Sequence, residues 1–275
     1  MAPANLRLLE PTPLANAFPG PAGAERPHIT IRGLCKRFQG VTIYDQFDLD
    51  VPRGKFVSVF GPNGCGKSTL INMIAGLIPC DAGEILFDGK TLAQTKIGYV
   101  FQNYREALFP WLSAFANIEY PLKLMGVGKA ERREKVQALV DHMGVKIDLA
   151  LYPYEMSGGQ QQLVSIMRAL VVDPEVLFLD EPFSALDYEM NLFMREQLQR
   201  LFVETGTTMV LVSHDLEEAV YLADYVLLLS RRPGRIADYP CVPMPRPRDG
   251  QTLSDPAFVA LKGHCLDIFQ REVRR

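Results

Sequence analysis

The segment Gly61–Ser68, GPNGCGKS, constrains this chain more than any other, because it fits the pattern GxxxxGK[ST] in full. A continuous apolar run at residues 56–60 precedes it, and a helical pattern at residues 68–76 follows it. Glycines let such a loop curl so that consecutive backbone N–H groups point at phosphate oxygens, and the following helix N-terminus adds partial positive charge. The sequence therefore predicts a phosphate-binding loop between a buried strand and a helix. The alternative, a glycine-rich turn that merely joins the two, does not account for the full pattern.

The residues of this loop have separate expected roles at a bound nucleotide. Lys67 is expected to reach the β- and γ-phosphates, and the hydroxyl of Ser68 to ligate Mg²⁺. Cys65 lies near a lysine and a helix N-terminus, which should lower the pKa of its thiol and expose it to alkylation. Thiol reagents are then expected to inhibit hydrolysis of the bound nucleotide, and Mg-ATP in the loop is expected to protect Cys65 from these reagents. The expected nucleotide-binding residues of the loop are Gly61, Pro62, Asn63, Gly64, Cys65, Gly66, Lys67, Ser68 and Thr69.

Two adjacent carboxylates, Asp180 and Glu181, follow the apolar run at residues 176–179. They stand at the carboxyl end of a predicted strand, where open α/β sheets place their ligands. Asp180 is expected to hold Mg²⁺ through water, and Glu181 to orient and polarise the attacking water. Two surface carboxylates would explain an isolated pair, but this pair accompanies a phosphate-binding loop.

The apolar patterns predict two kinds of strand. Alternation at Ile29 and Ile31, and again along residues 43–51, predicts half-buried antiparallel strands. Unbroken apolar runs at residues 56–60, 176–179 and 209–212 predict buried parallel strands. Helical patterns lie between the first two of these runs, at about residues 130–143 and after Ser157. The charged residues 129–135 are interpreted as the solvated face of the first helix.

The ends of the chain differ from its middle. Residues 1–27, rich in proline and alanine, are interpreted as a flexible tail. Residues 231–249 are expected to wrap over the surface in extended form, and Pro256 to open a final helix. The buried stripe expected on that helix is Phe258, Leu261, Cys265, Leu266 and Phe269.

Composition excludes several classes of function. A net charge of −3 gives no polycationic surface, so nucleic acid is not an expected partner. The apolar stretches fall short of the roughly 18–20 residues that span a bilayer, and the N-terminus does not match an export signal. The five cysteines are scattered and never spaced as CxxC, which argues against a zinc site and suits a reducing cytoplasm.

The segment at residues 156–162, MSGGQQQ, resembles the ABC signature, usually LSGGQ. The simplest structural explanation, a helix capped by the Ser157 hydroxyl, leaves the two successive glycines unexplained. The resemblance implies that this helix N-terminus binds the γ-phosphate of a nucleotide held by a second cassette. The residues concerned are Ser157, Gly158, Gly159 and Gln160.

Further ABC elements occur at matching positions. Gln102 matches the Q-loop glutamine, which contacts Mg²⁺ or water, and His214 matches the switch histidine that senses the γ-phosphate. Asp187 closes a segment that resembles the D-loop at the dimer interface. Phe38 is expected to stack on adenine, and Tyr44 to be a core residue instead. The resemblance thus implies that Glu181, His214, Gln102 and Lys67 carry catalysis, with Ser68, Gln102 and Asp180 at the metal.

The resemblance covers roughly residues 28–230 and implies an α/β fold. This would be a P-loop NTPase core with an antiparallel β subdomain and an inserted α-helical subdomain at about residues 103–172; residues 231–275 would form a C-terminal extension. The sequence departs from the usual pattern at Met156, Leu163, where arginine is usual, and Met167, where alanine is usual. None of these groups is assigned to phosphate chemistry, so an active ATPase is still expected.

Residues 107–112, ALFPWL, and 230–236, SRRPGRI, resemble segments of importers for nitrate, sulfonate, taurine and bicarbonate. Phe109 and Trp111 are then candidates for contact with a membrane partner, against plain packing of the helical subdomain.

This resemblance also implies partners: a second cassette, identical or a paralogue, transmembrane permease subunits and a periplasmic or lipid-anchored solute-binding protein. The chain would lie at the cytoplasmic face of the bacterial inner membrane. Its cofactors would be ATP and Mg²⁺. The alternatives are a soluble ABC ATPase that acts outside transport and a regulatory cassette.

Overall fold

The computed structural model describes residues 20, 25–184 and 186–274, apart from the side chains of residues 104 and 105. The expected flexible tail lies almost wholly outside these residues. Within them, one sheet has six strands in the spatial order β5-β6-β7-β3-β8-β9. The first five strands are parallel, and β9 runs antiparallel to β8. The strands are β3 (Phe56–Phe60), β5 (Ile97–Val100), β6 (Val176–Asp180), β7 (Thr208–Val212), β8 (Tyr225–Leu229) and β9 (Ile236–Asp238).

The second sheet is antiparallel, in the order β2-β1-β4. Its strands are β1 (Pro27–Phe38), β2 (Val41–Pro52) and β4 (Ala82–Phe87). Ile29 and Ile31 are fully buried and Thr30 between them is less so, because alternate side chains of a strand point to opposite faces. The expected α/β fold with an antiparallel sheet beside the parallel one is confirmed.

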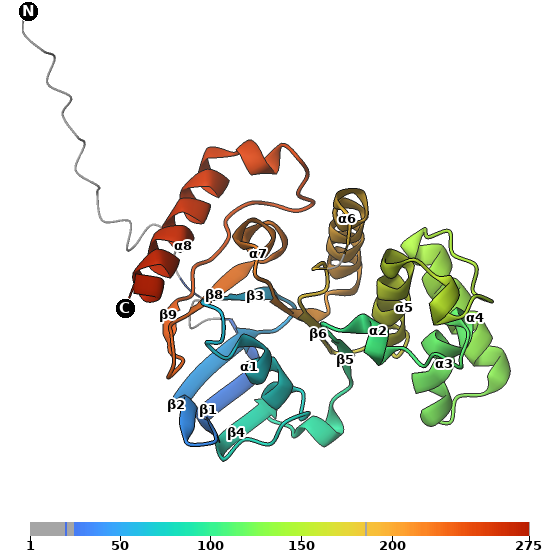
Figure 1. Cartoon of the computed structure of the whole chain (residues 1–275), viewed down its shortest axis with the longest axis horizontal. Coiled ribbons are helices and arrows are strands. Elements are labelled where there is room, and N and C mark those ends of the chain that lie inside the picture. The colour runs from blue at the N-terminus through green and yellow to red at the C-terminus, as the bar shows by residue number, and fades with distance from the viewer. Residues whose placement is uncertain (1–19, 21–24, 185, 275) are drawn as a thin grey trace, which may run out of the picture.

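Helices cover both faces of the parallel sheet (Figure 1). Alternation along β3 sends Val57 and Val59 into one core, and Phe56 and Phe60 into the other. The first core lies against α1 and the antiparallel sheet, and the second against α6, α7 and α8. These helices are α1 (Lys67–Ile74), α6 (Tyr188–Thr205), α7 (Leu216–Leu222) and α8 (Pro256–Arg274).

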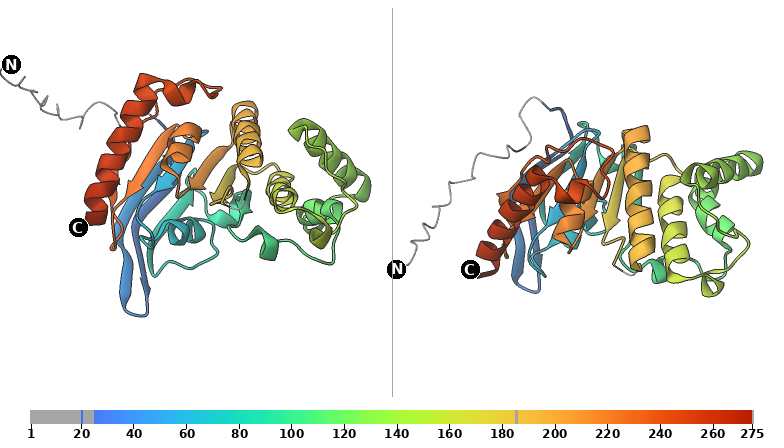
Figure 2. Two further views of the ribbon diagram at one scale, coloured as in Figure 1. Left: turned by 45° about the horizontal axis from the view of Figure 1, so that its top comes forward. Right: turned by 90° about the horizontal axis from the view of Figure 1, so that it is seen from above.

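A separate group of helices projects beyond the β5 edge of the sheet, at the opposite end of the molecule from α8 (Figure 2). All of them occur in the sequence between β5 and β6. They are α2 (Tyr104–Ala107), α3 (Ala114–Leu124), α4 (Lys129–Met143) and α5 (Gly158–Leu170). Val136, Val140 and Met143 bury one side of α4, and the charged residues at its start are mostly exposed, as expected.

Two predictions about the C-terminal extension are wrong. Leu266 is 41% exposed and does not belong to the buried stripe of α8. The stripe includes Phe258, Leu261 and Cys265, and Leu266 is turned about 100° from Cys265 around the helix. Residues 231–249 are also not simply a surface wrap, since Arg248 is 3% exposed and donates to the carbonyls of residues 220, 221 and 223. None of the helices described is long and apolar enough to span a membrane.

Candidate nucleotide-binding and catalytic site

The phosphate loop, Gly61–Ser68, joins the end of β3 to the start of α1. Gly66 precedes the helix with a φ of 117°, a conformation that L side chains rarely adopt. A Cβ atom at this position would lie 2.8 Å from Ile43 Cγ2 and 3.0 Å from the Tyr44 ring. The position therefore requires glycine, for its backbone angle and for the close approach of β2.

Lys67 folds back over the loop that precedes it. Its Nζ donates to the carbonyl of Gly61 at 2.9 Å and to that of Pro62 at 3.2 Å, and the residue is 7% exposed. The ammonium group is thus held at the mouth of the loop, at the N-terminus of α1, where a phosphate would also gain from the helix dipole.

Ser68 and Asp180 lie side by side. Ser68 Oγ donates to Asp180 Oδ1 at 2.9 Å, and the Tyr99 hydroxyl is 3.4 Å from Asp180 Oδ2. Burial raises the pKa of Asp180, although the Ser68 hydrogen bond opposes this. A buried carboxylate and a hydroxyl fit Mg²⁺, which prefers oxygen ligands and takes its remaining ones from phosphate and water. No group of three or more His, Cys, Asp or Glu that could hold a metal occurs in the part of the chain described.

Glu181 stands between two of the other expected catalytic residues. Gln102 Nε2 donates to Glu181 Oε2 at 2.9 Å, and His214 Nδ1 lies 3.4 Å from the same oxygen. The three side chains follow the adjacent parallel strands β5, β6 and β7, whose carboxyl ends share one edge. Glu181 has a φ of 46°, a conformation that is uncommon outside glycine and recurs at functional sites. The structure therefore brings the expected catalytic carboxylate, amide and imidazole together.

The signature segment, Ser157–Gln160, lies elsewhere in the molecule. Ser157 caps α5 by accepting from Gln160 N at 3.3 Å, while Gln160 Oε1 accepts from Ser157 N at 2.9 Å. Figure 1 places α5 beyond the β5 edge, away from α1 and the phosphate loop. Asp187 caps α6 in the same manner, accepting from Met190 N at 2.8 Å. A single chain thus does not bring the signature segment to its own phosphate loop.

The two aromatic candidates have different environments. Phe38 is 42% exposed, and Lys36 Nζ lies 5.0 Å from its ring centroid. Tyr44 is fully buried, as expected of a core residue. Its hydroxyl also donates to the carbonyl of Gly66 at 3.1 Å, a contact with the phosphate loop that the sequence did not indicate.

The expectation of an exposed, acidic thiol at Cys65 is wrong. Cys65 is 1% exposed, and burial raises the pKa of its thiol, outweighing the nearby charge of Lys67. Its side chain belongs to the core beneath the antiparallel sheet. The neighbouring lysine, which lowers the pKa of the thiol, is visible in the sequence, whereas the burial that raises this pKa is not.

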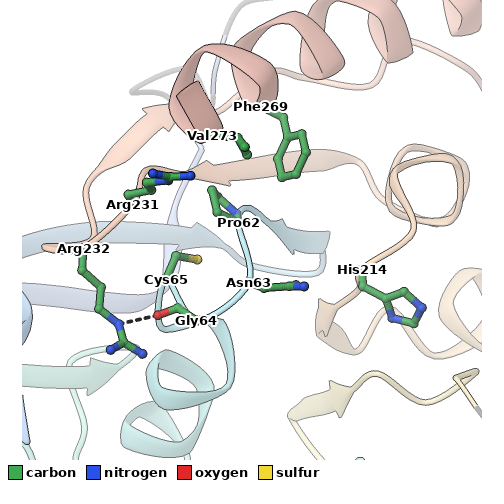
Figure 3. Close-up of a pocket in the computed structure, with 9 residues that line it drawn as sticks. All are labelled: Pro62, Asn63, Gly64, Cys65, His214, Arg231, Arg232, Phe269 and Val273. Carbon is green, nitrogen blue, oxygen red and sulfur yellow. Dashed lines mark hydrogen bonds between the residues drawn. The ribbon is translucent and has the colours of Figure 1, made fainter. Parts of the chain in front are cut away.

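A cavity of about 820 Å³ separates the phosphate loop from the last turns of α8 (Figure 3). Its rim includes Arg232, whose guanidinium donates through Nε to the carbonyl of Gly64. The sequence marked this arginine only as part of a subfamily segment, because 168 positions separate it from its partner. The lining residues are Pro62, Asn63, Gly64, Cys65, His214, Arg231, Arg232, Phe269 and Val273.

Comparison with known proteins gives a consistent result. The ABC transporter family model matches residues 44–184. The taurine import ATP-binding protein TauB of Yersinia pseudotuberculosis is 38% identical over 258 residues, 89% of this chain and 99% of that protein. A putative ATP-binding protein of Brucella abortus is 37% identical over 239 residues, 86% of this chain and 91% of its own. A solved dimeric bacterial ABC transporter cassette, 29% identical, superposes with a TM-score of 0.70 over 78% of this chain and 99% of its own.

Proposed function

The chain belongs to the ABC transporter family and is an ATP-binding subunit that couples ATP hydrolysis to transport; we propose that it energises the import of nitrate, sulfonate, taurine, bicarbonate or a similar small solute. The observation that carries its catalytic role is the convergence of Gln102 and His214 on one oxygen of Glu181. Glu181 directly follows Asp180, which accepts a hydrogen bond from Ser68 of the phosphate loop. The groups proposed to hold the phosphates and to activate water therefore meet at the same end of β6.

In the proposed mechanism, each of these residues has one task. Lys67 and the loop N–H groups bind the phosphates, and Ser68 and Asp180 would hold Mg²⁺, which neutralises charge on the transferred phosphoryl group. Glu181 accepts a hydrogen bond from the attacking water and polarises it. Gln102 donates to Glu181 and fixes its orientation, and would also help to hold Mg²⁺. His214 would sense the γ-phosphate. Phe38 stacks on adenine, in keeping with its exposed ring.

Hydrolysis is proposed to need two cassettes. The signature segment at the start of α5 lies away from the phosphate loop of its own chain, so a second copy or a paralogue must supply it. Asp187 is proposed to lie at the interface between the two cassettes. The helix N-terminus capped by Ser157 would then face the γ-phosphate across the interface. We retain residues 28–230 as the ATPase domain, with the helical subdomain at about 103–172 and the extension at 231–275.

The helical subdomain is the proposed contact with permease subunits. Trp111 is 70% exposed and its ring lies 5.5 Å from that of Phe109, so the pair presents an apolar surface. Trp111 follows Gln102 by nine residues in the chain, and an exposed apolar pair in this segment suits a partner whose movement must reach the catalytic residues. We further propose that the chain lies at the cytoplasmic face of the bacterial inner membrane, with a solute-binding protein on the other side.

Co-expression with the permease subunits tests this function. The chain should co-purify with them, and in liposomes its ATPase rate should rise when one of the candidate anions and its binding protein are added. A matched variant, Trp111→Ser, should hydrolyse ATP alone but lose co-purification. ATP turnover by a chain that binds no permease would instead support the soluble ATPase, and a chain without turnover in any assembly would support the regulatory cassette.

A further inference from the structure

The carbonyl groups of the phosphate loop have donors from several parts of the chain. A loop whose N–H groups face a phosphate turns its carbonyl oxygens outward, where each needs a partner. Lys67 serves the carbonyls of Gly61 and Pro62, and the Tyr44 hydroxyl serves that of Gly66 at 3.1 Å. The carbonyl of Gly64 accepts from Arg232 Nε (Figure 3). The C-terminal extension thus supplies one of the groups that fix the loop.

Arg232 lies on a turn that is itself firmly held. Ser230 N donates to the Arg235 carbonyl at 2.9 Å, and Arg235 N donates to Ser230 Oγ at 3.0 Å. Gly234 N donates to the Ile43 carbonyl at 2.7 Å, which ties the turn to β2. A Cβ at position 234 would lie 2.6 Å from Tyr44 Cε1, so only glycine fits against this ring.

The Ser230–Arg235 turn therefore reaches the phosphate loop by two routes. One is direct, from Arg232 to Gly64. The other passes through the Tyr44 ring, which packs against Gly234 on one side and Gly66 on the other, with its hydroxyl on the Gly66 carbonyl. Both routes end at carbonyl oxygens of the loop, those of Gly64 and Gly66.

We propose that Arg232 is a positioning residue for nucleotide binding, which holds the Gly64 carbonyl outward so that the neighbouring N–H groups face the phosphates. This rests on the proposed nucleotide site at Gly61–Ser68. The effect is one of preorganisation: a loop already in its binding shape loses less conformational freedom when the nucleotide arrives.

The length of the side chain allows a sharp test of this role. Arg232→Gln places an amide nitrogen where arginine has Nε, and so keeps a donor without the charge. Arg232→Met places a methyl group there and removes the donor at nearly the same length. Arg231→Met is the matched control, since Arg231 lies on the same turn and lines the same cavity. Arg232 is exposed, so these changes leave the core intact.

Dissociation constants for ATP and ADP, measured by titration calorimetry on the purified chain, decide the matter. Arg232→Met should weaken the binding of both nucleotides about fivefold, the effect of losing one hydrogen bond, while the affinities of Arg232→Gln and Arg231→Met stay within about twofold of the wild type. Wild-type affinity in Arg232→Met would overturn the proposal. Equal losses in Arg232→Gln and Arg232→Met would also overturn it, because the charge rather than the bond would then be responsible.

Hydrogen exchange provides a readout that does not need nucleotide. Without nucleotide, the amides of residues 61 and 63–68 should exchange faster in Arg232→Met than in the wild type, and at the wild-type rate in Arg232→Gln. Unchanged exchange in Arg232→Met would contradict the proposed role in shaping the loop. A wild-type chain that binds neither nucleotide would refute the proposed function instead, so the two failures can be distinguished.

Discussion

Glu181 combines, in one residue, an unusual backbone conformation and two polar neighbours. Its left-handed φ turns the chain at the end of β6, and its N–H donates to the Val212 carbonyl of β7 at 3.0 Å. The side chain is thereby directed toward Gln102 and His214. The resemblance to the ABC family implied that these three residues act together, but only the structure gives the hydrogen bond between Gln102 and Glu181.

Glu181→Gln should abolish hydrolysis while leaving nucleotide binding intact. The amide cannot accept a proton from water, and loss of a general base costs about 100-fold or more in kcat. Bound ATP should then accumulate and hold two chains together. Steady-state ATPase assays and size-exclusion chromatography with ATP measure both effects, and turnover at the wild-type rate would show that another group activates the water.

Cys65 should resist alkylation in the folded chain. Its thiol is buried and its pKa is raised, so it offers neither thiolate nor access to a reagent. Mass spectrometry after brief treatment with N-ethylmaleimide should find label on the partly exposed Cys35 and Cys80 before Cys65. Rapid labelling of Cys65, with loss of ATPase activity that Mg-ATP prevents, would restore the expectation drawn from sequence.

Helix α5 carries two of the residues that depart from the family pattern, Leu163 and Met167, and both serve its packing. Leu163 and Met167 are 5% and 0% exposed and belong to the core that joins the helical group to the sheet. Helical spacing predicted this helix and its Ser157 cap correctly, because both signals are local. The C-terminal turn at Ser230–Arg235 was not predicted in the same way, since its partners, Ile43 and Gly64, are distant in sequence.

Met167→Ala, which introduces the residue usual in the family, should destabilise this chain. The side chain is fully buried, and its removal leaves a cavity that costs about 2–4 kcal/mol. Met167→Leu, which conserves volume, should cost less than about 1.5 kcal/mol. Urea denaturation compares the two, and equal stability of Met167→Ala and the wild type would mean that the helix repacks around the smaller residue.

Helix α7 contains a carboxylate whose ionisation depends on folding. Burial raises the pKa of Glu218 to about 8. The positive charge of Arg195, 3.6 Å away, lowers this pKa, and the negative charge of Asp215 raises it further. In the unfolded chain a glutamate titrates near its usual value, about 4.3. The folded state therefore holds the proton more tightly, and this group's contribution to stability falls as pH rises from about 4 through about 8.

Glu218→Gln should lose this pH dependence. The variant should gain thermal stability relative to the wild type as pH rises from 6 to 8.5, by about 3 °C or more at the upper end. Glu217→Gln, one residue away on the same helix and more exposed, serves as the control and should show no such trend. Parallel unfolding curves of Glu218→Gln and the wild type across this range would contradict the assigned pKa shift.

At the scale of the whole molecule, the order of motifs along the chain predicted more than any single motif did. The unbroken apolar runs predicted β3, β6 and β7 of the parallel sheet, and the alternating segments predicted β1 and β2 of the antiparallel one. The arrangement of strands, β5-β6-β7-β3-β8-β9, depends on contacts far apart in sequence and came only from the structure. So did the packing of α8 against the end of β3, where the Phe60 and Phe269 rings lie 5.1 Å apart.

The separation of the signature segment from the phosphate loop has a genetic consequence. Lys67→Ala disables the loop half of a site, and Ser157→Arg disables the signature half, so each variant alone should be inactive. In a dimer of one Lys67→Ala chain and one Ser157→Arg chain, one nucleotide site contains both substitutions. The other site combines an intact phosphate loop with an intact signature segment. Randomly mixed chains should then recover roughly a quarter of the wild-type ATPase sites if the pair is a symmetric dimer. Two inactive alleles would complement each other on co-expression, and failure to do so would contradict a symmetric dimer in which either nucleotide site works alone.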